Sequence, residues 1–241
     1  MLRGEQENMC LKKVKECISK GKVKHSLTFN ELTSVQNILF NALPNLESSK
    51  FPDFVLRNAI IEHFKITSSK ETSKGSKDQQ ERFRFHKECD NELKDLVEKT
   101  ADVATPNEMR VLKKEMDCPE YNYENYVYSF KKNWEHHIKS LDKYDNNDKT
   151  VVFLVEYDGP IFAIMKPNQF VDFYDLHVDK EMLLYINQFK DKVDYVVFYD
   201  QTECEIIKLN DIMDIFKKIP EEIEFKSGKL KYFSISMLVD F

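Results

Sequence analysis

Two acidic residues in one short stretch of the chain have a spacing that could bind a metal ion. The stretch, FPDFVLRNAIIEHFKITSSK, runs from Phe51 to Lys70. It is typical of two strands joined by a tight turn at Arg57-Asn58, with Asp53 in the first strand and Glu62 in the second. Glu62 lies among apolar residues, where an unpaired carboxylate is costly to bury. A metal ion or another cation would offset that cost.

The register of this hairpin decides whether the two acids converge. Residues that face each other across an antiparallel ladder point to the same side of the sheet. If the turn is centred between positions 57 and 58, facing positions sum to 115, as 53 and 62 do. A slip of one residue would put Asp53 and Glu62 on opposite faces. Two converging carboxylates form an oxygen site of the kind that Mg²⁺ or Mn²⁺ uses, whereas acids at a solvent-facing sheet edge are the simpler alternative.

These residues carry a resemblance to a known family. A Pro-Asp pair, followed after a hairpin by an acid in a hydrophobic strand, resembles the PD-(D/E)xK nuclease superfamily, in a degenerate form that spans about residues 26 to 157. Asp53 and Glu62 match the two acids that hold a divalent metal in that family. The family also has a lysine two places after the second acid, which helps to position the attacking water. Phe64 occupies that position here, and Lys65 points to the other face.

The resemblance suggests substitutes for the missing lysine and a third acid. Lysines moved onto a later helix are a known variation in that superfamily, so Lys131 is one candidate, and Lys70 and Lys74 in the loop after the second strand are two others. Glu31, in the first turn of the helix before the hairpin, is a candidate third metal ligand. Each has a simpler alternative. Lys131 could lie along the apolar surface with its charge in water, the loop lysines could belong to a flexible linker, and Glu31 could simply favour the helix N-terminus.

The elements that must position these residues alternate between helices and strands. Apolar periodicity, caps and prolines predict helices at 9–18, 28–43, 79–100, 107–117, 121–144, 179–190 and 210–218. Runs of apolar and β-branched residues predict strands at 150–159, 195–200, 204–209 and 230–238. Residues 161–165 are predicted either to form a hairpin with 150–159 or to be the next strand. This order predicts an α/β fold with a mixed central sheet flanked by helices. The resemblance implies a restriction-endonuclease-like core.

Three regions are expected along the chain. Residues 1 to 25 form a basic N-terminal arm, and residues 26 to 157 form the nuclease-like core, with a helical insertion at about 79 to 118. Residues 158 to 241 form a C-terminal α/β extension of the same sheet. A chain of 241 residues is long enough to bury a sizeable core of this kind.

The sequence argues against a membrane span, a zinc cluster of closely spaced cysteines and a metal site at the two adjacent histidines. Without an apolar run of 18 residues or a charged and apolar leader, the sequence predicts no membrane span and a cytoplasmic protein. The five cysteines are widely spaced and no CxxC occurs, so local spacing indicates no zinc cluster and we expect reduced thiols. His136 and His137 are adjacent on a predicted helix and diverge by about 100 degrees, so they cannot chelate one ion together.

Charge is unevenly distributed along the chain. The formal net charge is −6, which argues against indiscriminate coating of nucleic acid. Residues 12 to 24 nevertheless carry about +5 and residues 65 to 87 about +4, whereas residues 151 to 241 carry about −7. The basic segments flank the acid pair, where a phosphate backbone would approach.

Together these observations predict a metal-dependent phosphodiesterase, an endonuclease acting on DNA, with Mg²⁺ or Mn²⁺ as cofactor. Bacterial or antiviral defence is the setting that the resemblance implies. Phe64 favours an alternative, a catalytically inactive module of the same fold that binds or senses nucleic acid. A protein-interaction subunit with an acidic, aromatic C-terminal half is a third class. Patterns for nucleotide loops, kinases and serine hydrolases are absent. Both DNA and RNA are compatible with the sequence as the nucleic acid that is bound, and so are a homo-oligomer and a partner subunit.

Overall fold

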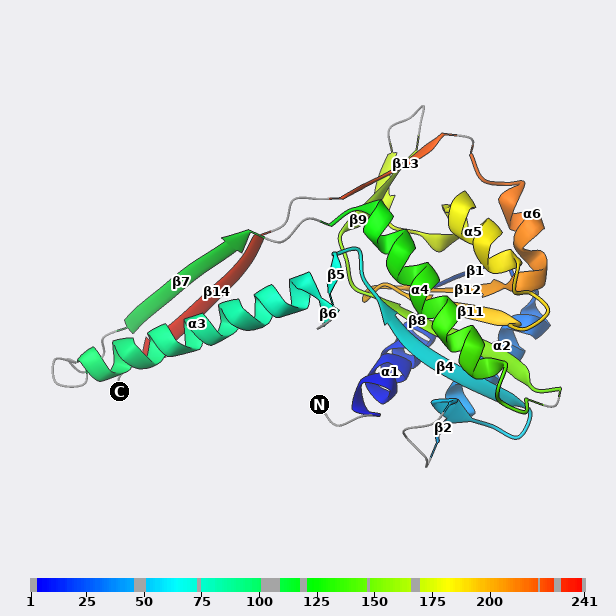
Figure 1. Cartoon of the computed structure of the whole chain (residues 1–241), viewed down its shortest axis with the longest axis horizontal. Coiled ribbons are helices and arrows are strands. Elements are labelled where there is room, and N and C mark those ends of the chain that lie inside the picture. Colours follow the sequence, from blue (N-terminus) through cyan, green and yellow to red (C-terminus); the bar gives the residue numbers. More distant parts are fainter. Residues whose placement is uncertain are drawn as a thin grey trace.

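A seven-stranded mixed sheet organises the computed structural model of the chain (Figure 1). The structure describes all residues except 1–3, 46–50, 73–74, 101–108, 118–120, 147, 166–169, 221, 228–230 and 240–241. The strand order is β1-β12-β11-β8-β4-β3-β2. The bounds are β1 Val23–His25, β2 Leu43–Pro44, β3 Phe54–Val55, β4 Ala59–Ile66, β8 Thr150–Tyr157, β11 Tyr195–Tyr199 and β12 Cys204–Lys208. Strands β4, β8 and β11 are parallel, and β3 runs antiparallel to both β2 and β4. Strand β12 is antiparallel to β11 and parallel to β1. The predicted α/β fold with a mixed, helix-flanked sheet is confirmed.

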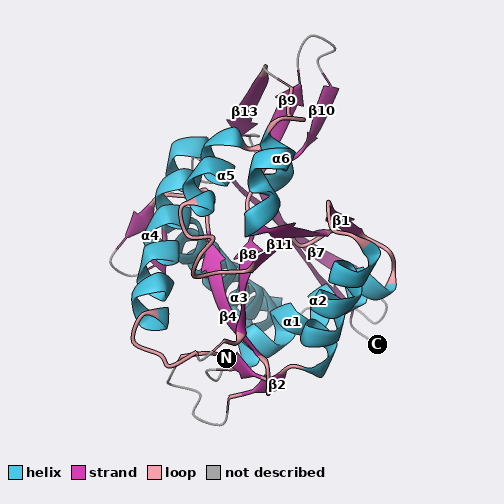
Figure 2. Cartoon of the chain, turned by 90° about the vertical axis from the view of Figure 1, so that its right-hand side faces the viewer, coloured by secondary structure: helices cyan, strands magenta, loops and turns pink. Residues whose placement is uncertain are grey.

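Helices cover both faces of this sheet (Figure 2). Helices α1 (Glu5–Ser19) and α2 (Phe29–Asn41) lie on one face. Helices α4 (Tyr123–Leu141), α5 (Lys180–Asn187) and α6 (Ile212–Phe216) lie on the other. The central strands are apolar on both sides because side chains alternate between the faces. In β8, Phe153 and Val155 pack towards α4, whereas Val152 and Leu154 pack towards α1 and α2.

Helix α4 forms as its sequence pattern predicts. Asn122 caps its N-terminus by accepting a hydrogen bond from the backbone N–H of Asn125. The buried stripe consists of Tyr126, Phe130, Trp134, Ile138 and Leu141. These residues recur every three to four positions, so one side of the helix is apolar along its whole length and seals the sheet.

Smaller sheets lie outside this core. Strands β9 (Ile161–Met165), β10 (Phe170–Phe173) and β13 (Ile223–Ser227) form a three-stranded sheet, and β5 (Glu71–Thr72) pairs with β6 (Gly75–Ser76). Strands β7 (Met109–Asp117) and β14 (Lys231–Val239) form a third sheet. Figure 1 shows that sheet and α3 (Lys77–Thr100) projecting together from one end of the core. Two short 3₁₀ helices, η1 (Leu176–Val178) and η2 (Leu209–Asp211), complete the described elements.

Three predicted elements differ from the structure. The helix predicted at 107–117 is wrong, because Met109–Asp117 is the strand β7. Its partner β14 lies at the other end of the chain, so no local pattern could reveal the pairing. Strand β14 therefore does not extend the central sheet, and β9 pairs with β10 and β13 instead of β8. Among the described residues of the C-terminal region, only β11 and β12 belong to the central sheet.

The N-terminal segment is also integrated more closely than an arm. Helix α1 buries Cys10, Leu11 and Val14 against the sheet, and β1 pairs in parallel with β12 at the sheet edge. These apolar contacts, which outweigh the charge of the surrounding lysines, make the segment part of the core. Among the described residues, no helix is long and apolar enough to cross a membrane.

Candidate functional site

The structure brings Asp53 and Glu62 together in the predicted register. Phe54 pairs with Ile61 and Val55 with Ile60, so each pair sums to 115 and the preceding position, Asp53, lies opposite Glu62. The backbone N–H of Asp53 donates to Glu62 Oε2 at 3.0 Å. The backbone N–H of His63 donates to Asp53 Oδ2 at 2.8 Å. The hairpin therefore holds both carboxyl groups side by side.

Burial changes the protonation of this acid pair. Glu62 is only 7% exposed and Asp53 is half-buried. Burial, and then the charge of Glu62, raise the pKa of Asp53 to about 7. Burial likewise raises the pKa of Glu62 to about 7, against the hydrogen bonds from Asp53. At neutral pH the pair therefore retains protons, which a bound cation would displace.

Helix α4 contributes a histidine to the acid pair. His137 Nδ1 lies 2.6 Å from Glu62 Oε1, and burial lowers the pKa of His137 to about 4, so the ring is neutral at pH 7. The Phe64 ring stacks on the His137 ring, with centroids 4.7 Å apart. Phe64 therefore holds His137 against Glu62. The available sequence signal was the position of His137 three residues after Trp134, at the edge of the apolar stripe.

The candidate lysines lie elsewhere. Lys131 Nζ bonds Glu181 of α5 at 2.8 Å and lies over the Tyr185 ring, so α4 directs it away from the acid pair. Lys70 is exposed and follows the carboxyl end of β4, which is already about 13 Å from Glu62 by strand rise. Lys74 lies outside the described residues. The structure therefore brings neither Lys131 nor Lys70 to the acids.

Glu31 also lies elsewhere. Its side chain closes a capping box with Thr28 at the start of α2 and pairs with Lys208 of β12. Two strands separate β12 from β4, which places them about 14 Å apart at ordinary strand spacing. Glu31 therefore serves the helix N-terminus, the simpler of the two alternatives, and does not join Asp53 and Glu62.

A second polar cluster lies at the carboxyl ends of the parallel strands. Its centre is Glu156 of β8, whose Oε2 is 3.2 Å from His63 Nε2. The other oxygen, Oε1, lies 3.1 Å from Gln201 Nε2 and 3.7 Å from Lys65 Nζ. Burial acts to raise the pKa of Glu156, but His63, Lys65 and Gln201 outweigh it and bring the value to about 2. Glu156 is therefore an ionised carboxylate inside the fold.

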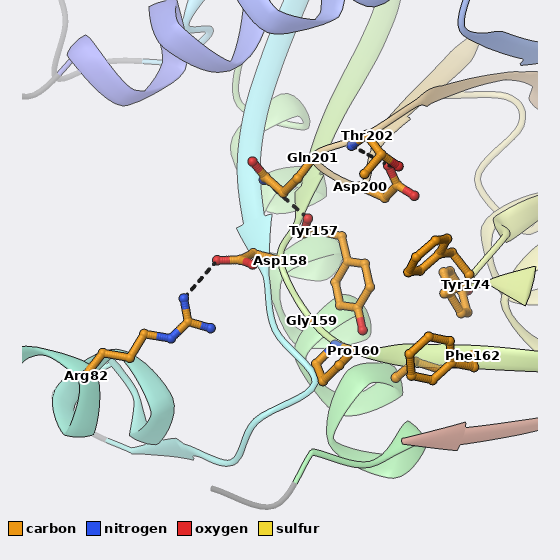
Figure 3. A pocket seen from close by; sticks show the side chains of 12 residues that line it. Arg82, Tyr157, Asp158, Gly159, Pro160, Phe162, Tyr174, Asp200, Gln201 and Thr202 are labelled. Atoms are coloured by element: carbon orange, nitrogen blue, oxygen red, sulfur yellow. Dashed lines mark hydrogen bonds and ion pairs between the residues drawn. The ribbon is translucent and has the colours of Figure 1, made fainter. Parts of the chain in front are cut away.

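A pocket of about 250 Å³ opens beside this cluster (Figure 3). Figure 3 shows the rings of Tyr157, Phe162 and Tyr174 gathered on one side of the pocket, with Asp158 and its ion-pair partner Arg82 on the other. Crevices at the carboxyl ends of parallel strands are the usual ligand sites of α/β sheets. No sequence pattern predicts the cluster or this pocket, because their residues come from distant segments.

Comparisons with known proteins give no family assignment. No protein-family model matches the chain, and neither a curated protein nor a solved structure matches it.

Proposed function

We propose that this protein is a metal-dependent phosphodiesterase that cleaves nucleic acid, in the first instance a DNA endonuclease. Asp53 and Glu62 are the metal-binding pair, with Mg²⁺ or Mn²⁺ as the cation. The observation that carries the proposal is the pair itself, two carboxyl groups held face to face by backbone hydrogen bonds and retaining protons near neutral pH.

The residues around the pair have defined tasks. Asp53 and Glu62 offer carboxylate oxygens, the ligands that hard divalent cations prefer. His137 contacts Glu62 Oε1 and so fixes the direction of that carboxylate, as a group behind a metal ligand does. A cation bound there would lower the pKa of a water ligand and neutralise charge on the scissile phosphate.

The fold supports the same proposal at a coarser level. Asp53 directly precedes β3, and Glu62 lies on the neighbouring antiparallel strand β4 of a mixed sheet with helices on both faces. That arrangement agrees with a restriction-endonuclease-like core, which remains part of the proposal. A role in defence rests on the sequence resemblance alone.

One observation favours a second candidate, a catalytically inactive module that binds or senses nucleic acid. Lys131 is engaged with Glu181, and Lys65 lies on the opposite face, within 3.7 Å of both Glu156 and Asp158. Lys70 follows the end of β4. None of these three described lysines can position a water at the acid pair in this conformation.

One experiment separates the two candidates. Calorimetric titration with Mg²⁺ and Mn²⁺, paired with cleavage assays on plasmid DNA and on RNA, should be run on the wild type, Asp53→Asn and Glu62→Gln. Glu16→Gln, an exposed acid on α1, is the matched control. We expect both acid variants to lose metal binding and cleavage while remaining folded. Metal binding without cleavage would support the inactive module. A wild type that neither binds metal nor cleaves nucleic acid would reject the metal-dependent phosphodiesterase.

A further inference from the structure

Potential metal ligands also meet on the other face of β4. Side chains alternate along this strand, so Glu62 faces α4 while His63 faces α1. Cys10 of α1, His63 of β4 and Glu156 of β8 each offer a ligand atom, and these atoms lie within 4.8 Å of one another. The three residues are 2%, 7% and 7% exposed. Three separate elements thus converge on one buried point.

The distances distinguish this group from the other histidine and carboxylate contacts. His63 Nε2 lies 3.2 Å from Glu156 Oε2, whereas the His137–Glu62 and His177–Glu205 contacts are both 2.6 Å. Bonds of about 2.0 to 2.1 Å to a tetrahedral zinc place two ligand atoms about 3.3 Å apart. Of these three contacts, the one at 3.2 Å has the spacing of two ligands on one ion.

A neighbouring group has a structural explanation instead. Asp175, His177 and Glu205 also come within ligand distance of one another. The carboxylate of Glu205 accepts the backbone N–H groups of Leu176 and His177, and Asp175 caps the same 3₁₀ helix. These hydrogen bonds hold η1 in place and explain why Asp175 and Glu205 lie there. We therefore propose no metal site at this group.

Groups around Glu156 resemble the outer shell of a metal site. Gln201 and Lys65 approach its Oε1 and leave Oε2 directed at His63, with Gln6 Nε2 3.4 Å from Oε2. Outer contacts of this kind orient a ligating carboxylate. Gln6 and Lys65, which both contact Glu156, also line a pocket of about 400 Å³.

We propose that Cys10, His63 and Glu156 form a transition-metal site suited to Zn²⁺, distinct from the acid pair. Thiolate, imidazole and carboxylate are all established zinc ligands, and three protein ligands leave one position for water. Burial keeps the Cys10 thiol protonated by raising its pKa far above the ordinary range, so zinc binding would release that proton. The acid pair offers oxygen ligands from Asp53 and Glu62, together with the contact to His137, and so favours harder cations.

The test uses Co²⁺ as a spectroscopic substitute for Zn²⁺ on chelator-treated full-length protein. We expect one equivalent of Co²⁺ to bind with thiolate-to-cobalt charge-transfer absorption, which one equivalent of Zn²⁺ abolishes by displacement. Cys10→Ser should lose the absorption and bind Zn²⁺ at least tenfold more weakly. The matched control is Cys17→Ser, because Cys17 is buried on the same helix but contacts the carbonyl of Thr202. Cys17→Ser and Glu62→Gln should both retain the absorption.

Two further outcomes keep the proposal falsifiable. Glu156→Gln retains every thiol, so its expected loss of at least tenfold in Zn²⁺ affinity tests the site even if Cys10→Ser does not fold. Circular dichroism of each variant checks folding. Absence of the charge-transfer absorption in the wild type would overturn the proposal, as would unchanged Zn²⁺ affinity in folded Glu156→Gln.

Discussion

At the scale of single residues, burial changes the protonation of the acid pair. Asp53 and Glu62 have ordinary pKa values of 3.8 and 4.5, and the fold raises both to about 7. At a pH between the ordinary and the raised pKa values, the two carboxyl groups keep their protons in the folded chain but have lost them in the unfolded chain. Because the folded state then binds more protons, the free energy of unfolding falls as pH rises through this interval.

The pH dependence of stability should reveal the pair. The contribution of these raised pKa values is fully present below about pH 4 and is lost as pH rises through about 7. Glu62→Gln should flatten this decline, by a difference on the order of 3 kcal/mol between the two limits. Urea unfolding across this pH range measures it, with Glu16→Gln as the control. Identical pH profiles for wild type and Glu62→Gln would contradict the assignment.

Mg²⁺ should stabilise the wild type more at pH 8 than at pH 5.

Two variants on one helix should separate the residue that serves the acid pair from the one that does not. His137→Ala removes the contact to Glu62 and should reduce Mg²⁺-dependent cleavage or Mg²⁺ affinity by at least tenfold. Lys131→Ala removes the bond to Glu181 and the contact with the Tyr185 ring, both away from the acid pair, and should change either by less than twofold. A large loss in Lys131→Ala, with His137→Ala unaffected, would restore the idea of a lysine moved onto α4.

At the scale of elements, α4 both covers the sheet and delivers His137. Its stripe centres on Trp134, whose ring stacks on Phe130 and meets Phe64 and Phe153 edge-on. Phe64 therefore contacts Trp134 on one side and His137 on another. The same packing that stabilises the helix sets the position of the histidine.

Trp134→Ala, which removes the central ring of this stripe, should destabilise the protein strongly. Trp134 is fully buried, and truncating such a residue costs about 3 to 5 kcal/mol through lost burial and the cavity left behind. Tyr128→Ala is the matched control, because Tyr128 is on the same helix and 61% exposed, and its loss should change stability by about 0.5 kcal/mol or less. Denaturant unfolding of both variants gives the comparison. Equal effects would mean that α4 does not pack as described.

At the scale of the whole molecule, the fold pairs acids with several of the basic residues that are concentrated at 12–24 and 65–87. Lys24 pairs with Asp175, Lys65 with Glu156 and Asp158, and Arg82 with Asp78 and Asp158. Asp175, Glu156 and Asp158, which come from distant segments, thus offset part of the charge of both basic segments. The local excess of lysine therefore overstates the positive surface available to a phosphate backbone.

The salt dependence of DNA binding should identify the lysines that still face a phosphate backbone. Lys70 and Lys77 are exposed beyond the end of β4, and Lys77 has only a surface partner, Glu81, among its described ion pairs. Reversing both charges to glutamate should flatten the slope of log affinity against log salt by roughly 2 on duplex DNA. Lys217→Glu with Lys226→Glu is the control pair on other elements. An unchanged slope in the first variant would remove this loop from the binding surface.

The sequence by itself determined the features that depend on neighbouring residues. The Arg57-Asn58 turn set the register of Asp53 against Glu62, and apolar spacing set the buried stripe of α4. Both follow from contacts within a hairpin or a helical turn, where chain geometry leaves few alternatives.

Only the tertiary structure decided which distant segments meet. The pattern at 107–117 suggested a helix, but pairing with β14 makes it a strand. His137 gains its role from the contact with Glu62, and Cys10, His63 and Glu156 become neighbours only when α1, β4 and β8 pack together. Side-chain periodicity indicates which face of an element is buried, but it does not specify the partner. Packing of the whole chain selects the partner, because burial rewards any complementary apolar face wherever it lies in the sequence.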